Sequence, residues 1–419
     1  MEKFAIISFV STVNKHSGLP WKGNVKKATQ EATKLHNTQL ILRTIYDRGE
    51  ISRADVARIT GLTRSTVSDI VSKLLNDGLV AETGFASSSG GKPPILLSVA
   101  DDSRYLIGID LANSEFRGAI VNLRGEIVSR VSMPINERDG DSALELVYTL
   151  VDKLLAASDK PIQGIGIGSP GLMDPVKGVV LKSVNLDWDN MPLGELLEAR
   201  FNLPVYIAND SQVAALAEFT FGSVDGISNL LLVKIGRGVG SGIIINGQLY
   251  YGDNYGAGEI GHVVVVENGE RCRCGNFGCL ETIISSRAIA KRAKSIARGN
   301  PESILNRFIS SPDEIDTEVL LRAYQAGDKE VRTIINETGE ILGRALAYTV
   351  CTLNINTVVI AGSLSRFGNV LRDPVELMVQ QCVLPAIGCQ TEVVTSQLGA
   401  DIVILGAASL ILSHEIGVV

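Results

Sequence analysis

The sequence predicts an α/β protein in which a small helix-turn-helix unit with a β-hairpin precedes a larger, two-lobed α/β body. Three observations support this fold class. Short amphipathic helical patterns fill residues 36–76, and a strand–turn–strand pattern follows them up to residue 100. From Tyr105 the pattern changes to apolar strands alternating with longer helices, and a second run of this kind starts near Leu230.

Composition and charge are typical of a soluble globular chain whose first hundred residues are basic. The 419 residues are 45% hydrophobic and carry a net charge of −7. Residues 1–100 hold 13 basic and 8 acidic residues, a net +5, which leaves −12 for the other 319. Such a distribution favours contact between the first domain and phosphates, although chance asymmetry is an alternative.

Targeting and membrane signals are not expected in this chain. No apolar run approaches the roughly 18–20 residues that span a bilayer, and the apolar residues 4–10 are too few for a signal-peptide core. We therefore expect a cytoplasmic protein without a membrane partner, with its six cysteines as thiols or metal ligands.

The sequence divides into four expected parts. They are a tail and lead-in (1–35, of which 1–22 is a tail or a doubtful translation start), a winged helix-turn-helix (36–100), a first lobe (104–222 plus 400–419) and a second lobe (223–399) with the zinc motif.

The helix-turn-helix begins with a helix expected from His36 to Gly49. Ser52 is the expected N-cap of a second helix, with Asp55 reaching back to it as a short substitute for a capping-box glutamate, and Gly61 ends that helix. Thr63 is the expected cap of a third helix, over 64–76. A helix-turn-helix requires a small residue, a turn glycine and docking apolar residues at set spacings, which are met by Ala57, Gly61, Val67 and Ile70.

This docking leaves the start of the third helix exposed, where base edges are read. The expected DNA contacts are Thr63, Arg64, Ser65, Thr66 and Ser68, together with Lys92 at the tip of the wing. The wing itself is predicted from strands at 79–82 and 95–99, and Lys92 is placed to touch a phosphate or enter the minor groove. A helical bundle without a DNA role is the alternative.

The body starts with the element order of an actin-like ATPase (ribonuclease H-like) half-domain. Strands are expected at 106–111, 118–123 and 127–131, then a helix at 142–157 and a strand at 162–168. A second half-domain is expected to start with the strand 230–235.

Three cysteines and a histidine have the spacing of a closed zinc site. Cys272, Cys274 and Cys279 lie within eight residues, and His262 precedes them by ten. Three thiolates and an imidazole complete a tetrahedral, structural type of zinc site, and glycines 275 and 278 permit the tight reversal that this needs. Buried free thiols are the alternative.

Four stretches together resemble the ROK family of repressors and sugar kinases, a resemblance that covers residues 36–415. They are residues 164–171, 204–210 with Ala214 and Ala215, 256–262, and the cysteine motif 272–281. The resemblance implies the two-lobed sugar kinase fold and the same four zinc ligands. Joined to a winged helix, it implies the branch of regulators that are similar to xylose and N-acetylglucosamine repressors.

The resemblance also implies a sugar pocket. It assigns sugar contacts to Asn209, Asp210, Glu259, His262 and Glu281, with Asn185 and Gly168 at the rim. Their carboxylate, amide and imidazole groups match sugar hydroxyls, and Asp210 is the general-base position if the chain is a kinase. The alternative interpretation makes Asn209 and Asp210 a turn and helix cap, and the glutamates surface charges.

The turns that hold phosphate in kinases are altered here. Kinases of this family follow the first-strand aspartate with Gly-Gly-Thr, whereas residues 110–114 of this chain are Asp-Leu-Ala-Asn-Ser. Arg237 replaces a small hydroxyl residue in the second turn, and residues 361–363 lack one glycine of the usual pair. ATP is therefore not an expected ligand, and no residue is expected to be catalytic.

The expected function is a sugar-responsive DNA-binding repressor of carbohydrate genes, acting as a homodimer or a dimer of dimers. A sugar that enters the cleft between the lobes would change the spacing of the recognition helices and release operator DNA. Two alternatives are an ATP-dependent sugar kinase (a hexokinase, for example) and a repressor whose sensor face binds a transport-system protein instead of a sugar.

Overall fold

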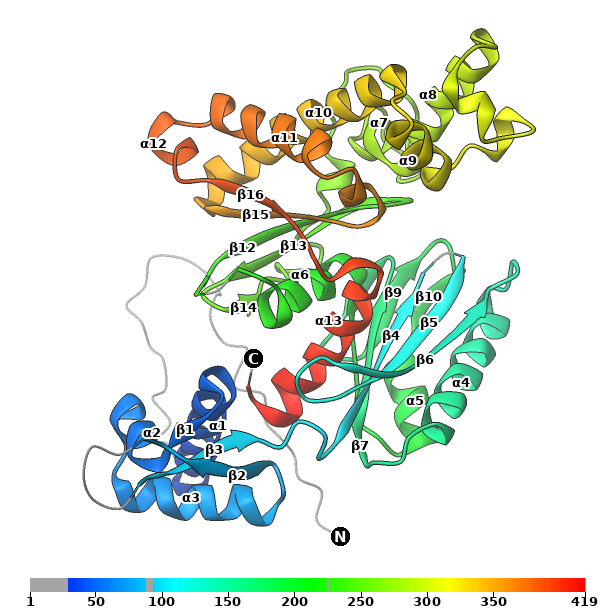
Figure 1. Ribbon diagram of the computed structural model, residues 1–419. Helices are drawn as coiled ribbons and strands as arrows, with labels where there is room; N and C mark the ends of the chain where they lie inside the picture. Colours follow the sequence, from blue (N-terminus) through cyan, green and yellow to red (C-terminus); the bar gives the residue numbers. More distant parts are fainter. Residues whose placement is uncertain (1–28, 88–92, 113, 225, 419) are drawn as a thin grey trace, which may run out of the picture.

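The computed structural model describes residues 29–418, except 88–92, 113 and 225 (Figure 1). Three helices and a three-stranded antiparallel sheet of order β1-β3-β2 form the N-terminal head. Its elements are α1 (Gln30–Arg48), β1 (Ile51–Ser52), α2 (Arg53–Thr60), α3 (Arg64–Asn76), β2 (Val80–Phe85) and β3 (Ile95–Val99). The winged helix-turn-helix prediction is therefore confirmed as a fold.

Two local predictions for the head need correction. Helix α1 begins six residues before the expected His36, because the Thr29 hydroxyl caps it by accepting from the amide of Ala32 at 3.1 Å. Asp55 does reach back to Ser52, but its carboxylate accepts from the Ser52 hydroxyl at 2.7 Å and not from the backbone. The expected caps Ser52, Thr63 and Gly61 are all in place.

The first lobe is a five-stranded mixed sheet of order β11-β7-β4-β5-β6. Its strands are β4 (Tyr105–Leu111), β5 (Glu115–Val121), β6 (Ile127–Pro134), β7 (Ile162–Ser169) and β11 (Val205–Asn209). Helices α4 (Gly140–Ala156) and α5 (Leu193–Phe201) cover one face of this sheet. A small antiparallel sheet extends the lobe, made of β8 (Leu172–Asp174), β9 (Val179–Ser183) and β10 (Trp188–Met191).

The second lobe is a five-stranded sheet of order β14-β13-β12-β15-β16. Its strands are β12 (Leu230–Ile235), β13 (Val239–Ile245), β14 (Gln248–Leu249), β15 (Thr357–Ala361) and β16 (Glu392–Thr395). The helices around its outer face are α7 (Glu281–Ile284), α8 (Ser286–Gly299), α9 (Thr317–Gln325), α10 (Lys329–Leu353), α11 (Asn369–Cys382) and α12 (Pro385–Gly388). The expected second half-domain therefore does start at Leu230.

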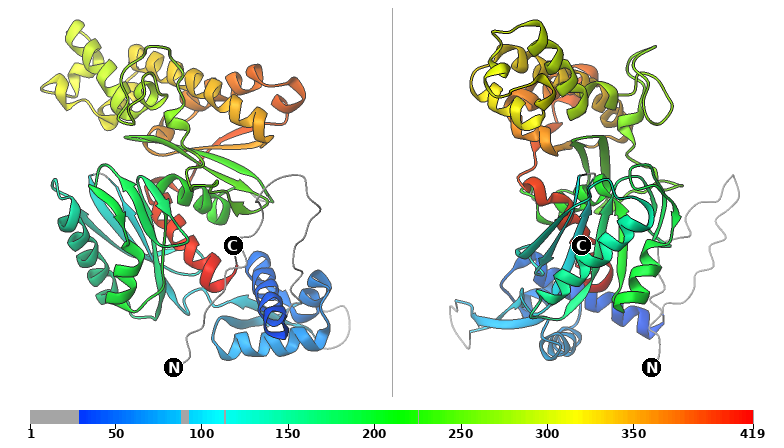
Figure 2. Two further views of the ribbon diagram at one scale, coloured as in Figure 1. Left: turned by 180° about the vertical axis from the view of Figure 1, so that it is seen from behind. Right: turned by 90° about the vertical axis from the view of Figure 1, so that its right-hand side faces the viewer.

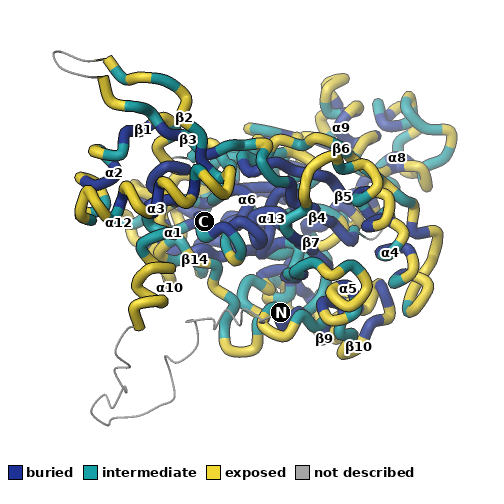
Figure 3. The backbone as a smooth tube through the Cα atoms, turned by 90° about the horizontal axis from the view of Figure 1, so that it is seen from below, coloured by how far each residue is buried: buried dark blue, intermediate teal, exposed yellow. Residues whose placement is uncertain are grey.

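Helices α6 (Asp210–Phe221) and α13 (Ile402–Ile411) form a middle layer between the two sheets (Figure 1). Every residue of α13 is buried (Figure 3). Glycines allow this close packing, since a Cβ on Gly166 would lie 1.8 Å from the carbonyl oxygen of Ala407, and one on Gly406 equally close to that of Val213. Burial on all sides explains why α13 is apolar around its whole circumference.

The segment Gly399–Ile416 is long and apolar enough to cross a membrane by length and composition, which corrects our expectation that no such run exists. Two thirds of it is buried inside the body. A core helix that is hydrophobic all round passes the same test as a membrane span, and here it fills the space between two sheets.

The head rests on the end of the first lobe, beside the C-terminal end of α13 (Figure 2). The Tyr46 hydroxyl donates to the carbonyl of Leu123 at 2.8 Å, and the Arg124 guanidinium stacks 4.3 Å from the centroid of the Tyr46 ring. Arg124 also donates to the Tyr46 carbonyl at 2.7 Å. These contacts fix α1 against the β5–β6 turn.

Candidate functional site

A cleft of about 660 Å³ opens between the lobes and is lined by residues from both. The first lobe contributes the ends of β4 and β7 and the start of α6, and the second contributes the β12–β13 turn and the cysteine loop. All five predicted sugar-contact residues line this cleft, and Asn185 lies at its rim. Gly168 does not line it, because Gly168 is buried where β7 packs against Val213 and Val403.

The four predicted metal ligands converge at one side of the cleft. Their candidate ligand atoms all lie within 4.8 Å of one another. Nδ1 of His262 is 3.6 Å from Sγ of Cys272, and Sγ of Cys274 is 3.7 Å from Sγ of Cys279. A tetrahedral ion with bonds of about 2.1–2.3 Å needs ligand separations of this size. The arrangement therefore fits a four-coordinate metal site.

The local backbone and the protonation chemistry agree with this fit. Gly275 and Gly278 have φ values of 101° and 72°. Residues with a Cβ rarely adopt such positive φ values, whereas glycine does so readily. A Cβ on Gly278 would also lie 1.7 Å from the carbonyl oxygen of Val266. Burial raises the pKa of the Cys279 thiol, and a bound cation would favour its thiolate form.

One ring nitrogen of His262 faces the cysteine sulfurs, and the other faces the cleft. Because Nδ1 faces the sulfur atoms, Nε2 points the other way and lies 3.7 Å from Oε2 of Glu259. Burial, together with the charges of Asp210 and Glu281, raises the pKa of Glu259. The pair offers a polar donor and acceptor to a ligand hydroxyl.

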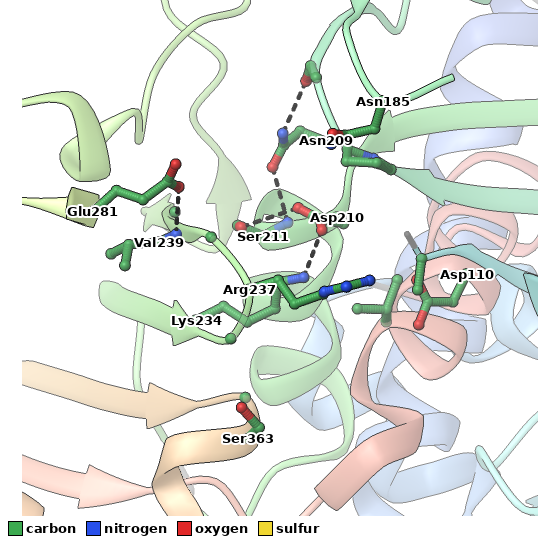
Figure 4. Close-up of a pocket in the computed structure, with 18 of the residues that line it drawn as sticks. Asp110, Asn185, Asn209, Asp210, Ser211, Lys234, Arg237, Val239, Glu281 and Ser363 are labelled. Atoms are coloured by element: carbon green, nitrogen blue, oxygen red, sulfur yellow. Dashed lines mark hydrogen bonds and ion pairs between the residues drawn. The ribbon is translucent and has the colours of Figure 1, made fainter. Parts of the chain in front are cut away.

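The other predicted sugar residues already have intramolecular partners (Figure 4). Oδ1 of Asn209 caps α6 by accepting from the amide of Ser211 at 2.8 Å, while Nδ2 donates to the carbonyl of Gly171 at 2.9 Å. The helix-cap alternative is therefore correct for Asn209, which keeps one N–H for a ligand. Oε2 of Glu281 accepts from the amide of Val239 at 2.9 Å, which leaves Oε1 without a hydrogen bond among the described residues.

Sequence reasoning missed Lys234, which forms an ion pair with Asp210. Nζ of Lys234 lies 2.5 Å from Oδ2 of Asp210, and the Ser211 hydroxyl donates to Oδ1 at 3.1 Å. The signal was available, because Lys234 is the single charge in the apolar strand 230–235. Both carboxylate oxygens of Asp210 therefore have partners before any ligand binds.

A second missed cation, Arg117, reaches Asp110 at the start of the first phosphate turn. Its guanidinium pairs with the buried carboxylate of Asp110 at 2.5 Å and donates to the carbonyl of Ala400 at 2.9 Å. Burial raises the pKa of Asp110, and the charges of Lys234 and Arg117 oppose that shift. Asn113 of the same turn lies outside the described residues, as does Lys92 of the wing.

The start of α3 is exposed, as predicted for a recognition helix. The side chains of Arg64, Ser65 and Ser68 are exposed, whereas Val67 is fully buried against the head. Thr63 has a capping role, because its hydroxyl accepts from the amide of Thr66 at 3.2 Å and contacts the Thr66 hydroxyl at 2.8 Å. The Ser65 hydroxyl also contacts that of Thr63, at 3.0 Å, so Arg64 and Ser68 are the better candidates for base contacts.

Residues 106–414 match the ROK family model, and residues 35–81 match a winged helix-turn-helix DNA-binding model. The chain belongs to the ROK family. A ROK relative named xylose repressor, from Caldicellulosiruptor bescii, is 34% identical over 384 residues, which cover 90% of this chain and 95% of that one.

Two solved ROK structures share the fold. One is the crystal structure of a ROK family transcriptional regulator, a homologue of the Escherichia coli MLC protein. It has a TM-score of 0.81 and 27% identity, and covers 92% of this chain and 98% of its own. The other is a ROK glucokinase from Streptomyces griseus in complex with glucose and AMPPNP, with a TM-score of 0.67 and 28% identity, over 73% of this chain and 98% of its own.

Proposed function

We propose that this chain is a sugar-responsive repressor that binds operator DNA through its head and a sugar in the cleft of its body. One observation carries the proposal. A winged helix with an exposed recognition helix is joined to a ROK cleft in which Lys234 already pairs with Asp210. The relatives that match nearly the whole chain are named as a repressor and a transcriptional regulator. The chain therefore acts in transcription and is not an enzyme.

The kinase alternative is disfavoured by charge as well as by similarity. A general base must accept a proton from the sugar hydroxyl, and both oxygens of the Asp210 carboxylate are already engaged, by Lys234 and by Ser211. Arg117 also pairs with Asp110 at the start of the first turn. Asp210 is better suited to accept a hydrogen bond from a sugar hydroxyl than to start phosphoryl transfer, and ATP is not the expected ligand.

Zinc is the proposed metal, held by His262 and the three cysteines of the loop. Three sulfur donors and one imidazole favour zinc over the oxygen-preferring cations. The bound ion would fix the ring plane of His262 and keep Nε2 directed at Glu259 and the sugar. The ion has no place in a reaction, because four protein ligands leave no open coordination position.

Helix α13 is the proposed connection between the sugar cleft and the head. At its start Ile402 and Val403 line the cleft. Just beyond its end Leu412 and Ile416 belong to the same apolar cluster as Ile45 of α1. A sugar that closes the lobes on α13 would therefore shift the apolar surface against which α1 of the head packs. In a cytoplasmic homodimer or dimer of dimers, this shift would change the spacing of two recognition helices.

Operator binding across a sugar panel tests the function. A binding site is selected from random DNA, and its affinity for the full-length protein is measured by fluorescence anisotropy at one fixed salt concentration, since salt sets the affinity scale. We expect at least one sugar to change operator affinity at least fivefold, and saturating operator to change the affinity for that sugar by the same factor. Unchanged sugar affinity at saturating operator would refute the coupling.

Two further measurements on the same protein distinguish the alternative functions. Turnover of ATP with a sugar, lost in Asp210→Asn, would favour the kinase. DNA binding without any thermal shift from a sugar would favour a protein partner at the sensor face.

Arg64→Ala tests the recognition helix. We expect a loss of about 1–3 kcal/mol in operator affinity, because a bidentate base contact contributes about this much, with the sugar response of the body intact. Arg48→Ala, at the exposed end of α1, is the matched control. Equal losses for the two variants would show that Arg64 contributes only general charge.

A further inference from the structure

Phe85 is the most exposed large apolar side chain among the described residues of the head. It ends strand β2 and is 68% exposed, against 52% for Leu35 and 46% for Ile59. Its partner on β3 is Ile95, which is half-buried, and the preceding Pro94 is exposed. The described part of the wing therefore ends in an apolar surface that none of the described elements covers.

A β-bulge sets the direction in which Phe85 projects. The pairing of β2 with β3 shifts by one residue at Thr83, so two residues of β2 oppose one of β3 there. Beyond the bulge Phe85 pairs with Ile95, and paired residues of antiparallel strands project from the same face of a sheet. Leu97 shares that face and is fully buried in the same apolar cluster as α3. Phe85 therefore projects to the side of the sheet on which the recognition helix lies.

Strands β2 and β3 project beyond the helices of the head (Figures 2 and 3). Val80, at the start of β2, is buried in the core of the head. From Val80 to Phe85 the strand spans about 15 Å. Neighbouring grooves of B-DNA lie about half a helical turn, or roughly 17 Å, apart. With α3 in a major groove, the reach of the wing therefore matches the adjacent minor groove.

The residue types of the wing also suit a DNA groove. Residues 83–95 contain no acidic residue, so no carboxylate of this segment repels DNA phosphates. The preceding Glu82 pairs with Arg53 of α2 at 2.9 Å. Phenylalanine, proline and isoleucine are among the side chains that minor-groove proteins wedge between base steps. The apolar end of the wing is therefore complementary to a partly unstacked base step.

We propose that Phe85 enters the minor groove beside each operator half-site and unstacks one base step there. This inference rests on the proposed repressor function and deepens it, because it adds a second groove contact and a bend in the operator. Pyrimidine–purine steps are the most easily unstacked, so such a step is expected opposite Phe85. Specificity at that step comes from its deformability, since a phenyl ring makes no hydrogen bond to a base edge.

Binding of the full-length protein to its selected operator tests the contact. Phe85→Ala should weaken operator affinity about tenfold, as the loss of an aromatic contact with a base does. The slope of log affinity against log salt concentration should stay unchanged, because no charge is removed. Phe85→Leu, which keeps an apolar wedge, should restore most of the affinity. Tyr348→Ala, an exposed aromatic residue of α10 in the second lobe, is the matched control and should bind as the parent does.

A spectroscopic measurement separates a wedge from a structural role. Operators that each carry one 2-aminopurine report unstacking of that base as a rise in fluorescence. The parent should raise the fluorescence at one step beside each half-site, and Phe85→Leu should do the same. Phe85→Ala should leave that step stacked.

The outcomes distinguish this inference from the proposed function. Phe85→Ala that binds the operator within twofold of the parent would overturn the inference and leave the repressor standing. An unchanged 2-aminopurine signal in Phe85→Ala, or a smaller assembly in light scattering, would also overturn it, and the second result would place the ring between copies of the chain. Failure of the parent to select any DNA sequence would overturn both.

Discussion

Cys279→Ser is expected to remove the proposed zinc site and to abolish the sugar response while DNA binding persists. Cys279 is fully buried, and its sulfur lies 3.7 Å from that of Cys274. Structural zinc contributes roughly 10–16 kcal/mol in small zinc-binding peptides, so its loss should release the loop and free His262 from its fixed orientation. Among the residues that the structure describes, the four candidate metal ligands all belong to the body. Metal content by mass spectrometry and operator binding with and without sugar are the measurements.

Cys382→Ser is the matched control for this experiment. Cys382 is an exposed cysteine at the end of α11 and lies outside the metal cluster. It should retain the metal and the full response. A Cys279→Ser protein that has lost its zinc but still responds to sugar as the parent does would contradict the role given to the loop.

Gly406→Ala is expected to destabilise the body by about 3 kcal/mol or more. The added Cβ would lie 1.8 Å from the carbonyl oxygen of Val213, a backbone atom that a side-chain rotation cannot move. Overpacking of a core typically costs about 1–3 kcal/mol, and here α13 and α6 must separate along buried surfaces. The free energy of unfolding from urea denaturation measures the effect.

Gly299→Ala supplies the comparison, because it ends helix α8 and a Cβ there meets no atom within 4 Å. Its unfolding free energy should stay within about 1 kcal/mol of the parent. Equal stability of the two variants would mean that the middle layer is looser than the packing distances indicate.

Much of this architecture was predictable because its signals are local. The caps Ser52 and Thr63 and the turn at Gly61 are set by short-range hydrogen bonds and by positive φ, and the structure has all three. The cysteine loop was equally predictable from the sequence, since its three candidate sulfur ligands lie within eight residues. The start of α1 was missed because a single threonine cap preceded a polar stretch without apolar periodicity.

The cations of the cleft were not predictable in the same way. Lys234 meets Asp210, and Arg117 meets the Ala400 carbonyl, only after strands and helices distant in sequence have assembled. Periodicity gives the face of an element on which a residue lies but not the residue that it will meet. The same limit explains why Gly168 was wrongly placed at the rim of the cleft. Its strand was predicted, but its burial against Val403 depends on the position of α13.

The place of α13 in the chain has a consequence for folding kinetics. Its partners β4 and β7 are made early, whereas α13 follows the entire second lobe in sequence. Contacts of such long sequence separation raise contact order and slow folding, because the loop between them must close before they form. On the ribosome, β4 and β7 would therefore keep one apolar face uncovered until the whole second lobe and α13 have been synthesised. This interval is the one in which the nascent chain most needs chaperone protection against aggregation.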